Sequence, residues 1–365
     1  MNKELRFHEQ LGQGRHARVR LALIGQQYRA IKMFETRFQN EFDRERTIYE
    51  TDLIQHPNIL GRIIDRFHFH VLCSAFFGAD FYAKGAETYH ILIFEWHPCG
   101  TLYDVLKADP SITKEKLFQY SISLCDGLAH LHSIKYGTNG TKNPLKNSIR
   151  FRCLFFLDIC KPQMAHCDIK SSNILVKLNG DCCLSDFSLA VRYQQNEIQG
   201  GGIERLSHRV GTKLYMPPEL LNPISQFHFD RINAYQQADM YSLALVLWEI
   251  ANSYCSFVHV RPYENQLPIN FTVENLVRLV CIEEKRPISC LIPSDKVKKK
   301  AHIQIEFIFF DLDYSIIFQF TRILLVSRSM CTSISCEFTR STSTITLSNL
   351  VSSLLLFFFS RLIKN

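Results

Sequence analysis

The sequence predicts an α+β fold in which strands come first and helices follow. Three observations predict it. Residues 28–32 are typical of a strand, and residues 91–97 are a short apolar run that also favours a strand. Residues 39–52 have the length and character of a helix. Residues 238–249 place apolar side chains at helical spacing and predict a long buried helix in the second half of the chain.

A glycine-rich segment lies near the start of the chain. It runs from Leu11 to Val19 between two predicted strands, and Gly12 and Gly14 would let backbone N–H groups approach phosphates. Lys32 ends the next strand and would reach the α- and β-phosphates of a nucleotide. The alternative for Lys32 is a solvated charge at the end of a strand.

The most informative segment covers residues 164–188. Asp168 is followed five residues later by Asn173, and Asp186 comes after a short apolar run. Phosphoryl transfer needs a carboxylate that accepts the proton of a hydroxyl group, and oxygen ligands for Mg²⁺ or Mn²⁺. We expect Asp168 to be this base, and Asn173 and Asp186 to be the metal ligands. Lys170 would neutralise charge on the transferred group. A chance match to a short loop pattern is the alternative.

These motifs stand in the order found in protein kinases, and the chain resembles that family. The resemblance rests on the glycine-rich loop, Lys32, residues 164–175, residues 184–188 and residues 210–219. It implies a two-lobed protein kinase fold, with a small antiparallel-sheet lobe and a helical large lobe. It also implies ATP-dependent phosphorylation of protein.

The resemblance assigns further roles in the nucleotide site. Glu45, in the predicted helix, would form the ion pair with Lys32, and Phe94 would be the gatekeeper that ends the hinge strand. Lys170 and Thr212 favour serine or threonine as the acceptor. The residues that we expect around ATP are Leu11, Gly12, Gln13, Gly14, Val19, Ala30, Lys32, Glu95, Trp96, His97 and Leu175.

Several segments narrow the resemblance to the receptor serine/threonine kinases of the transforming growth factor-β superfamily. They include residues 171–177, 211–213 and 245–249. Residues 14–17 and the pair Cys182-Cys183 are closer to type II receptors than to type I. The resemblance implies that a type I receptor kinase is the protein substrate. It also implies membrane association, with the kinase domain facing the cytoplasm.

The composition agrees with an intracellular globular domain. The chain has 365 residues with 46% hydrophobic content, enough to bury a two-lobed core. A net charge of +7 is modest and does not indicate a nucleic-acid partner. Thirteen cysteines without the spacing of a zinc site predict free thiols in a reducing compartment.

We expect a kinase domain over residues 1–293, divided near residue 97 into the small and large lobes, and an unmatched tail over residues 294–365. No signal peptide is visible at the N-terminus. Residues 345–363 are a weak span candidate, because their length is near the ~20 residues of a bilayer helix but polar residues interrupt them. Residues 67–81 and 143–160 are apolar insertions that resemble no kinase segment and would have to form surface loops.

The chain also departs from the family pattern. Cys167 replaces the arginine of H-R-D and would remove a cationic partner for a phosphate in the activation loop. Ser188 replaces the glycine of D-F-G, and Pro217 replaces the alanine of A-P-E. After about residue 293 the last helices of the large lobe are missing, including the arginine that would pair with Glu219.

Three hypotheses therefore stay open. The preferred one is an active serine/threonine kinase. The second is a catalytically impaired binding module that docks a partner receptor, favoured by Cys167, Ser188 and the missing helices. The third is a chain that does not fold stably. We also hypothesise that the two insertions and the tail are misassigned translated sequence, which messenger RNA carrying all three in frame would contradict.

Overall fold

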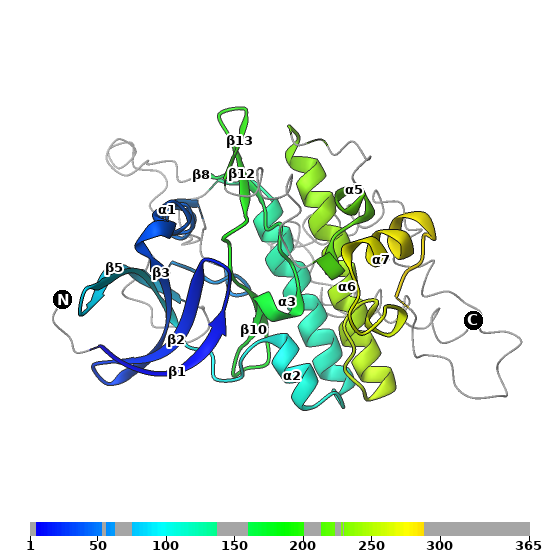
Figure 1. The fold of residues 1–365 in the computed structure, drawn as a ribbon, viewed down its shortest axis with the longest axis horizontal. Coiled ribbons are helices and arrows are strands. Elements are labelled where there is room, and N and C mark those ends of the chain that lie inside the picture. Colours follow the sequence, from blue (N-terminus) through cyan, green and yellow to red (C-terminus); the bar gives the residue numbers. More distant parts are fainter. Residues whose placement is uncertain are drawn as a thin grey trace, which may run out of the picture.

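An antiparallel sheet and a group of helices lie side by side in the structure, which is a computed structural model (Figure 1). It describes residues 5–52, 56–62, 75–136, 160–200, 213–222, 228 and 230–287. The sheet comes from the first 95 residues, and the helical part follows it in the chain. This is the order of strands and helices that the sequence predicts.

The small lobe is built on one six-stranded sheet with the order β1-β2-β3-β6-β5-β4. All neighbours pair antiparallel except β4 and β5, which pair in parallel. Gly25 and Gly85 lie in the tight turns between strands at φ +64° and +63°, the left-handed region that glycine adopts without strain. The strands are β1 (Leu5–Gln13), β2 (Ala17–Ile24), β3 (Gln27–Glu35), β4 (Gly61–Arg62), β5 (Ala75–Lys84) and β6 (Glu87–Glu95).

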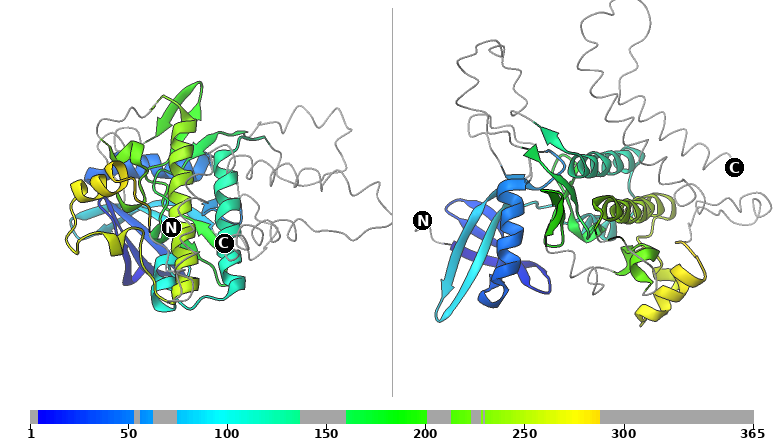
Figure 2. Two further views of the ribbon diagram at one scale, coloured as in Figure 1. Left: turned by 90° about the vertical axis from the view of Figure 1, so that its right-hand side faces the viewer. Right: turned by 90° about the horizontal axis from the view of Figure 1, so that it is seen from above.

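One helix covers one face of this sheet (Figure 2). It is α1 (Gln39–Thr47), preceded by the short helix η1 (Thr36–Phe38) and continued by a π-helical turn, η2 (Ile48–Asp52). Its Phe42 is 2% exposed and contacts the ring of Phe34 from β3 at 5.8 Å between centroids. The helix that the sequence predicts over residues 39–52 is therefore present and packs on the sheet.

Residues 75–81 are part of this sheet, although we expected them to belong to an apolar insertion that forms a surface loop. Phe76 in β5 is 3% exposed and stacks on Tyr49 at 5.1 Å. Its neighbour Phe77 is exposed, and the guanidinium of Arg29 lies 4.1 Å from its ring centroid. The pairing of β5 with β6 shifts register between Phe76 and Gly78, so Phe77 lies at an irregularity of the strand while Phe76 packs into the core. Residues 67–74 and 143–159 of the expected insertions lie outside the described residues.

Two long helices lie side by side through the large lobe, α3 (Lys114–His132) and α6 (Ile232–Ser256) (Figures 1 and 2). The buried helix predicted over residues 238–249 lies within α6. Strands β9 (Gln163–Ala165) and β11 (Cys182–Leu184) pack against α3, and the loops of the candidate site follow these two strands. The remaining elements are α2 (Leu102–Ala108), β7 (Lys135–Tyr136), β8 (Cys160–Lys161), β9 (Gln163–Ala165), η4 (Ser171–Asn173), β10 (Ile174–Val176), β11 (Cys182–Leu184), β12 (Val191–Gln194), β13 (Glu197–Gly200), η5 (Lys213–Tyr215), α5 (Pro218–Leu221), η6 (Glu264–Gln266), α7 (Val273–Val277) and η7 (Arg278–Ile282).

Two expectations about cysteines and membrane spans can be compared with the described part of the chain. No disulfide joins any of the cysteines recorded there. No helix within the described ranges combines the length and the apolar character needed to cross a bilayer. The span candidate at residues 345–363 lies outside these ranges.

Candidate active site

The glycine-rich segment forms the turn between β1 and β2. The N–H of Gly14 donates to the carbonyl of Ala17 at 2.8 Å and closes this turn, while Gly12 pairs with Val19. A Cβ added to Gly12 would meet no heavy atom within 4 Å, so its backbone faces open space. Leu11 and Gln13 are exposed at the end of β1. This open strand-turn-strand geometry suits phosphates, and the phosphate-binding role stays a prediction.

Lys32 lies at the centre of the candidate site and contacts two carboxylates. Its Nζ donates to both oxygens of Glu45 at 2.8 Å and to Oδ1 of Asp186 at 2.9 Å. Glu45 projects from α1 and is 1% exposed. The three residues come from a strand, a helix and a loop 154 residues away from Lys32 in the chain. The structure thus brings together the ion pair expected between Lys32 and Glu45.

The opposite charges of Lys32, Glu45 and Asp186 stabilise one another's ionised forms. Burial works against the ammonium of Lys32, but the charges of Asp186 and Glu45 outweigh burial and raise the pKa of Lys32. Burial likewise disfavours the carboxylate of Asp186, but Lys32 outweighs it and holds the pKa of Asp186 well below its usual value. Lys32 and Asp186 are therefore both charged at neutral pH.

The predicted base, Asp168, lies in a loop that is tied to its neighbours. Lys170 Nζ donates to Oδ2 of Asp168 at 2.7 Å. Asn173 Nδ2 donates to the same oxygen at 2.8 Å and to the backbone carbonyl of Asp168 at 2.9 Å. The loop therefore holds the carboxylate in one orientation, with a cation beside it. Since the Asn173 amide nitrogen is used in this way, its amide oxygen is the atom available to a metal.

Asp239 in α6 holds the backbone of this loop. Its carboxylate accepts from the N–H of His166 at 2.6 Å and from the N–H of Cys167 at 2.8 Å, and Nε2 of His132 lies 2.9 Å from it. Cys167 has φ +64°, which is strained for a residue with a side chain. The buried carboxylate of Asp239 stabilises this strained turn just before Asp168.

The second predicted metal ligand, Asp186, follows β11 and lies at the same end of a hairpin as Asn173. Ile174 of β10 pairs with Leu184 of β11, and the N–H of Ser185 donates to the carbonyl of Asn173 at 3.0 Å. Asp186 also has φ +64°, and its side chain remains 37% exposed. An amide oxygen and a carboxylate form an oxygen donor set that suits Mg²⁺. These residues therefore fit a magnesium ion.

The hinge segment joins the two lobes beside β3 and β10. Ala30 of β3 pairs with Phe94 of β6, and Phe94 is 6% exposed against Tyr49 and Phe76. After Glu95 and Trp96, a turn forms in which the N–H of Gly100 donates to the carbonyl of His97. The next residue, Thr101, forms an isolated bridge with Leu175. Two of the residues expected around adenine, Ala30 and Leu175, thus lie beside the hinge segment from opposite lobes.

Comparisons with known proteins agree with this geometry. Residues 157–302 match the family described as protein kinase domain. The chain contains a protein kinase domain. Its sheet lobe and helical lobe are the two lobes of the kinase fold that the sequence predicts.

The relatives of the kinase domain are receptors. TGF-beta receptor type-1 from rat (Rattus norvegicus) is 34% identical over 289 residues, which is 77% of this chain and 49% of the relative. The human (Homo sapiens) protein of that name has the same identity and coverage. Activin receptor type-1 from chicken (Gallus gallus) is 32% identical over 291 residues, 78% of this chain and 50% of the relative. The chain spans about half the length of the curated relatives that it matches.

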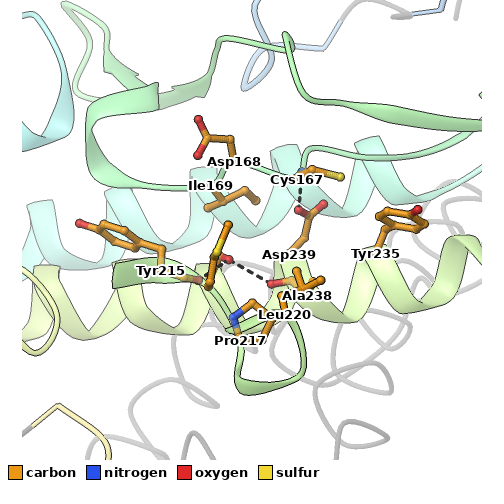
Figure 3. A pocket seen from close by; sticks show the side chains of 11 residues that line it. Cys167, Asp168, Ile169, Tyr215, Pro217, Leu220, Tyr235, Ala238 and Asp239 are labelled. Atoms are coloured by element: carbon orange, nitrogen blue, oxygen red, sulfur yellow. Dashed lines mark hydrogen bonds between the residues drawn. The ribbon is translucent and has the colours of Figure 1, made fainter. Parts of the chain in front are cut away.

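Cys167 occupies an apolar environment at the position where the kinase pattern has arginine. Figure 3 shows a small cavity between residues 166–173, the predicted catalytic loop, and α6; it is lined by Cys167, Asp168 and Asp239, among others. Burial, with the charge of Asp239, raises the pKa of the Cys167 thiol well above its usual value. The thiol is therefore neutral and cannot replace the cation. The surrounding apolar cluster consists of Ala165, Val191, Leu220, Ile232, Tyr235 and Ala238.

Glu219 has a nearby cation, contrary to what the sequence suggested. Burial raises its pKa, and the charge of Arg286 acts in the opposite direction. Arg286 follows η7, before the point where the resemblance to kinases ends. Arg286 thus supplies positive charge to Glu219, although the arginine that the family pattern pairs with this glutamate is missing from the sequence.

Glu249 is a further buried carboxylate of the kinase domain, to which we assigned no role from the sequence. Glu249 of α6 is fully buried and accepts from Ser171 Oγ at 2.8 Å and from the hydroxyl of Tyr215 at 2.7 Å, and His259 Nε2 lies 2.6 Å away. Ser171 directly follows Lys170. Glu249 therefore links the catalytic loop to η5. In the sequence, Glu249 could have been noticed as an acidic residue inside an apolar helical pattern.

Proposed function

We propose that this kinase domain transfers the γ-phosphoryl group of ATP to serine or threonine in a protein, with Mg²⁺ or Mn²⁺ as cofactor. The observation that carries the proposal is the position of Lys32, which contacts Glu45 and Asp186 at 2.8 and 2.9 Å. This contact requires β3, α1 and the loop after β11 to be aligned at once. Such alignment is what phosphoryl transfer demands of a kinase.

The chain's own residues would do the following work. Asp168 accepts the proton of the attacking hydroxyl, with its carboxylate oriented by Asn173. Lys170, 2.7 Å from that carboxylate, neutralises negative charge on the transferred group. Lys32 orients the α- and β-phosphates, because Glu45 holds its ammonium in place. Asn173 and Asp186 would hold the metal ion, which neutralises charge on the β- and γ-phosphates.

The remaining expected nucleotide contacts come from three segments. The glycine-rich turn with Leu11, Gly12, Gln13 and Gly14 would cover the phosphates. The hinge residues Glu95, Trp96 and His97 would face adenine with their backbone. Val19, Ala30 and Leu175, all partly buried, would pack against the base.

The receptor context is part of the proposal. The relatives are named as TGF-beta and activin receptors, which supports a receptor-type serine/threonine kinase at a membrane, with its kinase domain facing the cytoplasm. The proposed protein substrate is a type I receptor kinase. The type II-like assignment rests on residues 14–17 and on Cys182-Cys183, and it stays a prediction, since the named relatives are of type 1.

One experiment tests binding and transfer together. The melting temperature of the purified chain is measured with and without Mg-ATP, alongside Asp186→Ala and Asp168→Asn. Ligand at about 100 times its Kd stabilises a protein by about 2.7 kcal/mol, so a clear upward shift is expected for the parent chain. We expect the shift to persist in Asp168→Asn and to be lost in Asp186→Ala. Phosphate transfer to a protein acceptor should occur in the parent chain alone, on serine or threonine.

A second candidate function is a binding module that docks a partner receptor without phosphoryl transfer. The observation that favours it is the neutral, buried thiol of Cys167 at the position of a kinase arginine. It predicts a melting shift with Mg-ATP but no transfer by the parent chain. Transfer that is abolished by Asp168→Asn would exclude it. A chain with no cooperative melting transition would contradict both functions.

A further inference from the structure

The sheet of the small lobe has a second face that the nucleotide site does not use. Neighbouring residues of β3 point to opposite faces, so Met33 lies on the face opposite to Lys32 and Phe34. Met33 belongs to an apolar cluster with Ile31, Tyr89 and Ile91, separate from the main core. The sheet curls around this face, because Phe7 of β1 contacts Tyr82 of β5 at 4.9 Å between ring centroids.

This curl encloses a cup with a volume of about 380 Å³. Such a volume lies in the range of small-molecule sites, roughly 300–1,000 Å³. Aromatic rings of Phe7, Tyr82 and Tyr89 form its walls, and Met33 contributes to its lining. The cup is therefore large enough to hold a small ligand, and its lining combines aromatic rings with charged side chains.

Two arginines of β2 stand in the cup and are held on its aromatic walls. The guanidinium carbon of Arg18 lies 5.0 Å from the ring centroid of Tyr89, and that of Arg20 lies 5.0 Å from the ring centroid of Phe7. One terminal nitrogen of Arg18 donates to the hydroxyl of Tyr89 at 2.7 Å, and one of Arg20 donates to the carbonyl of His8 at 2.6 Å. These cation–π contacts and hydrogen bonds hold both guanidinium groups and leave several N–H donors of each unused.

The charges of the cup are not balanced. Arg18, Arg20 and Lys84 contribute three cations, and Glu87 contributes the one carboxylate of the lining. Glu87 accepts a hydrogen bond from the hydroxyl of Tyr89. Within the described ranges no carboxylate lies at ion-pair distance from either arginine. Two fixed guanidinium groups without an ion-pair partner favour a ligand with a doubly charged oxyanion.

We propose that this cup binds a small phosphate monoester that carries a flat apolar group. The phosphate receives N–H donors from Arg18 and Arg20 and the charge of Lys84, and the flat group packs against Tyr82, the wall ring that neither guanidinium group covers. The site lies on the face of the sheet opposite to Lys32. It is therefore independent of the nucleotide site and of phosphoryl transfer.

The test uses the full chain, with phenyl phosphate as the probe and Mg-ADP at saturation to occupy the nucleotide site. Titration calorimetry should show binding in the parent chain that weakens as salt is raised. Benzyl alcohol, which has the ring but no charge, should not bind, and inorganic phosphate should bind more weakly than phenyl phosphate. Binding that Mg-ADP abolishes would place the probe in the nucleotide site and overturn the proposal.

Four variants make the test specific. Arg18→Gln and Arg20→Gln should each weaken binding roughly tenfold or more, since each removes a charge-assisted hydrogen bond. Glu87→Gln should strengthen binding, because it removes the opposing carboxylate. Arg231→Gln, at an exposed arginine of the large lobe, should leave binding unchanged.

Folding of the variants is checked by their melting transition and by the shift with Mg-ADP. If the arginine variants do not fold, Lys84→Gln replaces them, because this exposed side chain makes no described contact that supports the sheet. It should weaken binding several-fold. Equal affinity in the parent chain, the cup variants and Arg231→Gln would overturn the proposal.

Discussion

Lys32 is the residue on which the arrangement of the small lobe depends, because it neutralises a carboxylate that has almost no access to water. The side chain of Glu45 is 0% exposed and that of Lys32 is 12% exposed. A buried ion pair adds little net stability, but removing one partner leaves a buried charge behind. The ion pair therefore aligns β3 with α1, and breaking it lowers the free energy of unfolding.

This cost can be measured with a double-mutant cycle. Lys32→Met should lower the free energy of unfolding by about 3–5 kcal/mol, because Glu45 loses its nearest cation. Glu45→Gln, added to Lys32→Met, should recover part of this loss, because the amide carries no charge. Urea denaturation of the four proteins gives the coupling energy. A double variant no more stable than Lys32→Met would contradict the argument.

His97 provides a pH-dependent test at the hinge. It is 8% exposed, and burial together with the charge of Lys177 lowers its pKa to about 4. The unfolded chain, with a histidine pKa of about 6.5, therefore binds the proton more tightly than the folded chain between pH 6.5 and 4. The contribution of His97 to the free energy of unfolding is fully present above pH 6.5. It should fall by roughly 3 kcal/mol as the pH drops to 4. His97→Gln should lack this part of the decline in thermal melts.

Lys161 acts at the scale of an element, because it closes the C-terminal end of α3. It is fully buried, and its Nζ donates to the carbonyls of Leu131, Ser133 and Pro162 at 2.6, 2.8 and 2.9 Å. The last carbonyls of a helix lack partners within it, and a cation there also favours the helix dipole. One ammonium thus joins the end of α3 to the strand that leads to the catalytic loop.

Lys161→Met should destabilise the fold by about 2–4 kcal/mol, since buried carbonyls lose their donor. The matched control is Lys116→Met, an exposed lysine on the first turn of the same helix, which should change stability by less than about 0.5 kcal/mol. Chemical denaturation of both variants measures the difference. Equal stability would show that other groups satisfy these carbonyls.

The helices and strands could be predicted from the sequence where a motif or a periodic pattern of apolar residues indicated them. Residues 39–52 and 238–249 carried such marks, and the structure has helices at both places. Strand β5 was missed because two adjacent phenylalanines, Phe76 and Phe77, looked like a continuous apolar run. Their opposite exposures come from the partner strand β6 and from Arg29, and a single sequence shows neither.

At the scale of the whole molecule, the candidate site was predictable and its surroundings were not. Lys32, Asp168 and Asp186 could be proposed from the sequence because their residue types and order are tied to one reaction. The influence of the Arg286 charge on Glu219, and the curl that brings Phe7 to Tyr82, depend on how distant segments pack together. Contacts between distant segments depend on packing across the whole fold, which local sequence patterns do not encode.

Phe187 is a buried ring that contacts both lobes. Phe187 is 0% exposed and lies 5.7 Å from the ring of Tyr49 in the small lobe and 4.9 Å from that of His166 in the large lobe. It directly follows Asp186, which contacts Lys32 at 2.9 Å. The packing of Phe187 therefore fixes both the contact between lobes and the position of the predicted metal ligand.

Phe187→Ala should accordingly have two effects. It should lower the free energy of unfolding by about 3–5 kcal/mol, the usual cost of truncating a buried phenylalanine. It should also reduce the melting shift with Mg-ATP, because Asp186 is no longer held in place. Phe81→Ala, at a ring that is 65% exposed on β5, is the control and should leave the shift intact. A full Mg-ATP shift in a destabilised Phe187→Ala would mean that the ion pairs of Lys32 alone align the lobes.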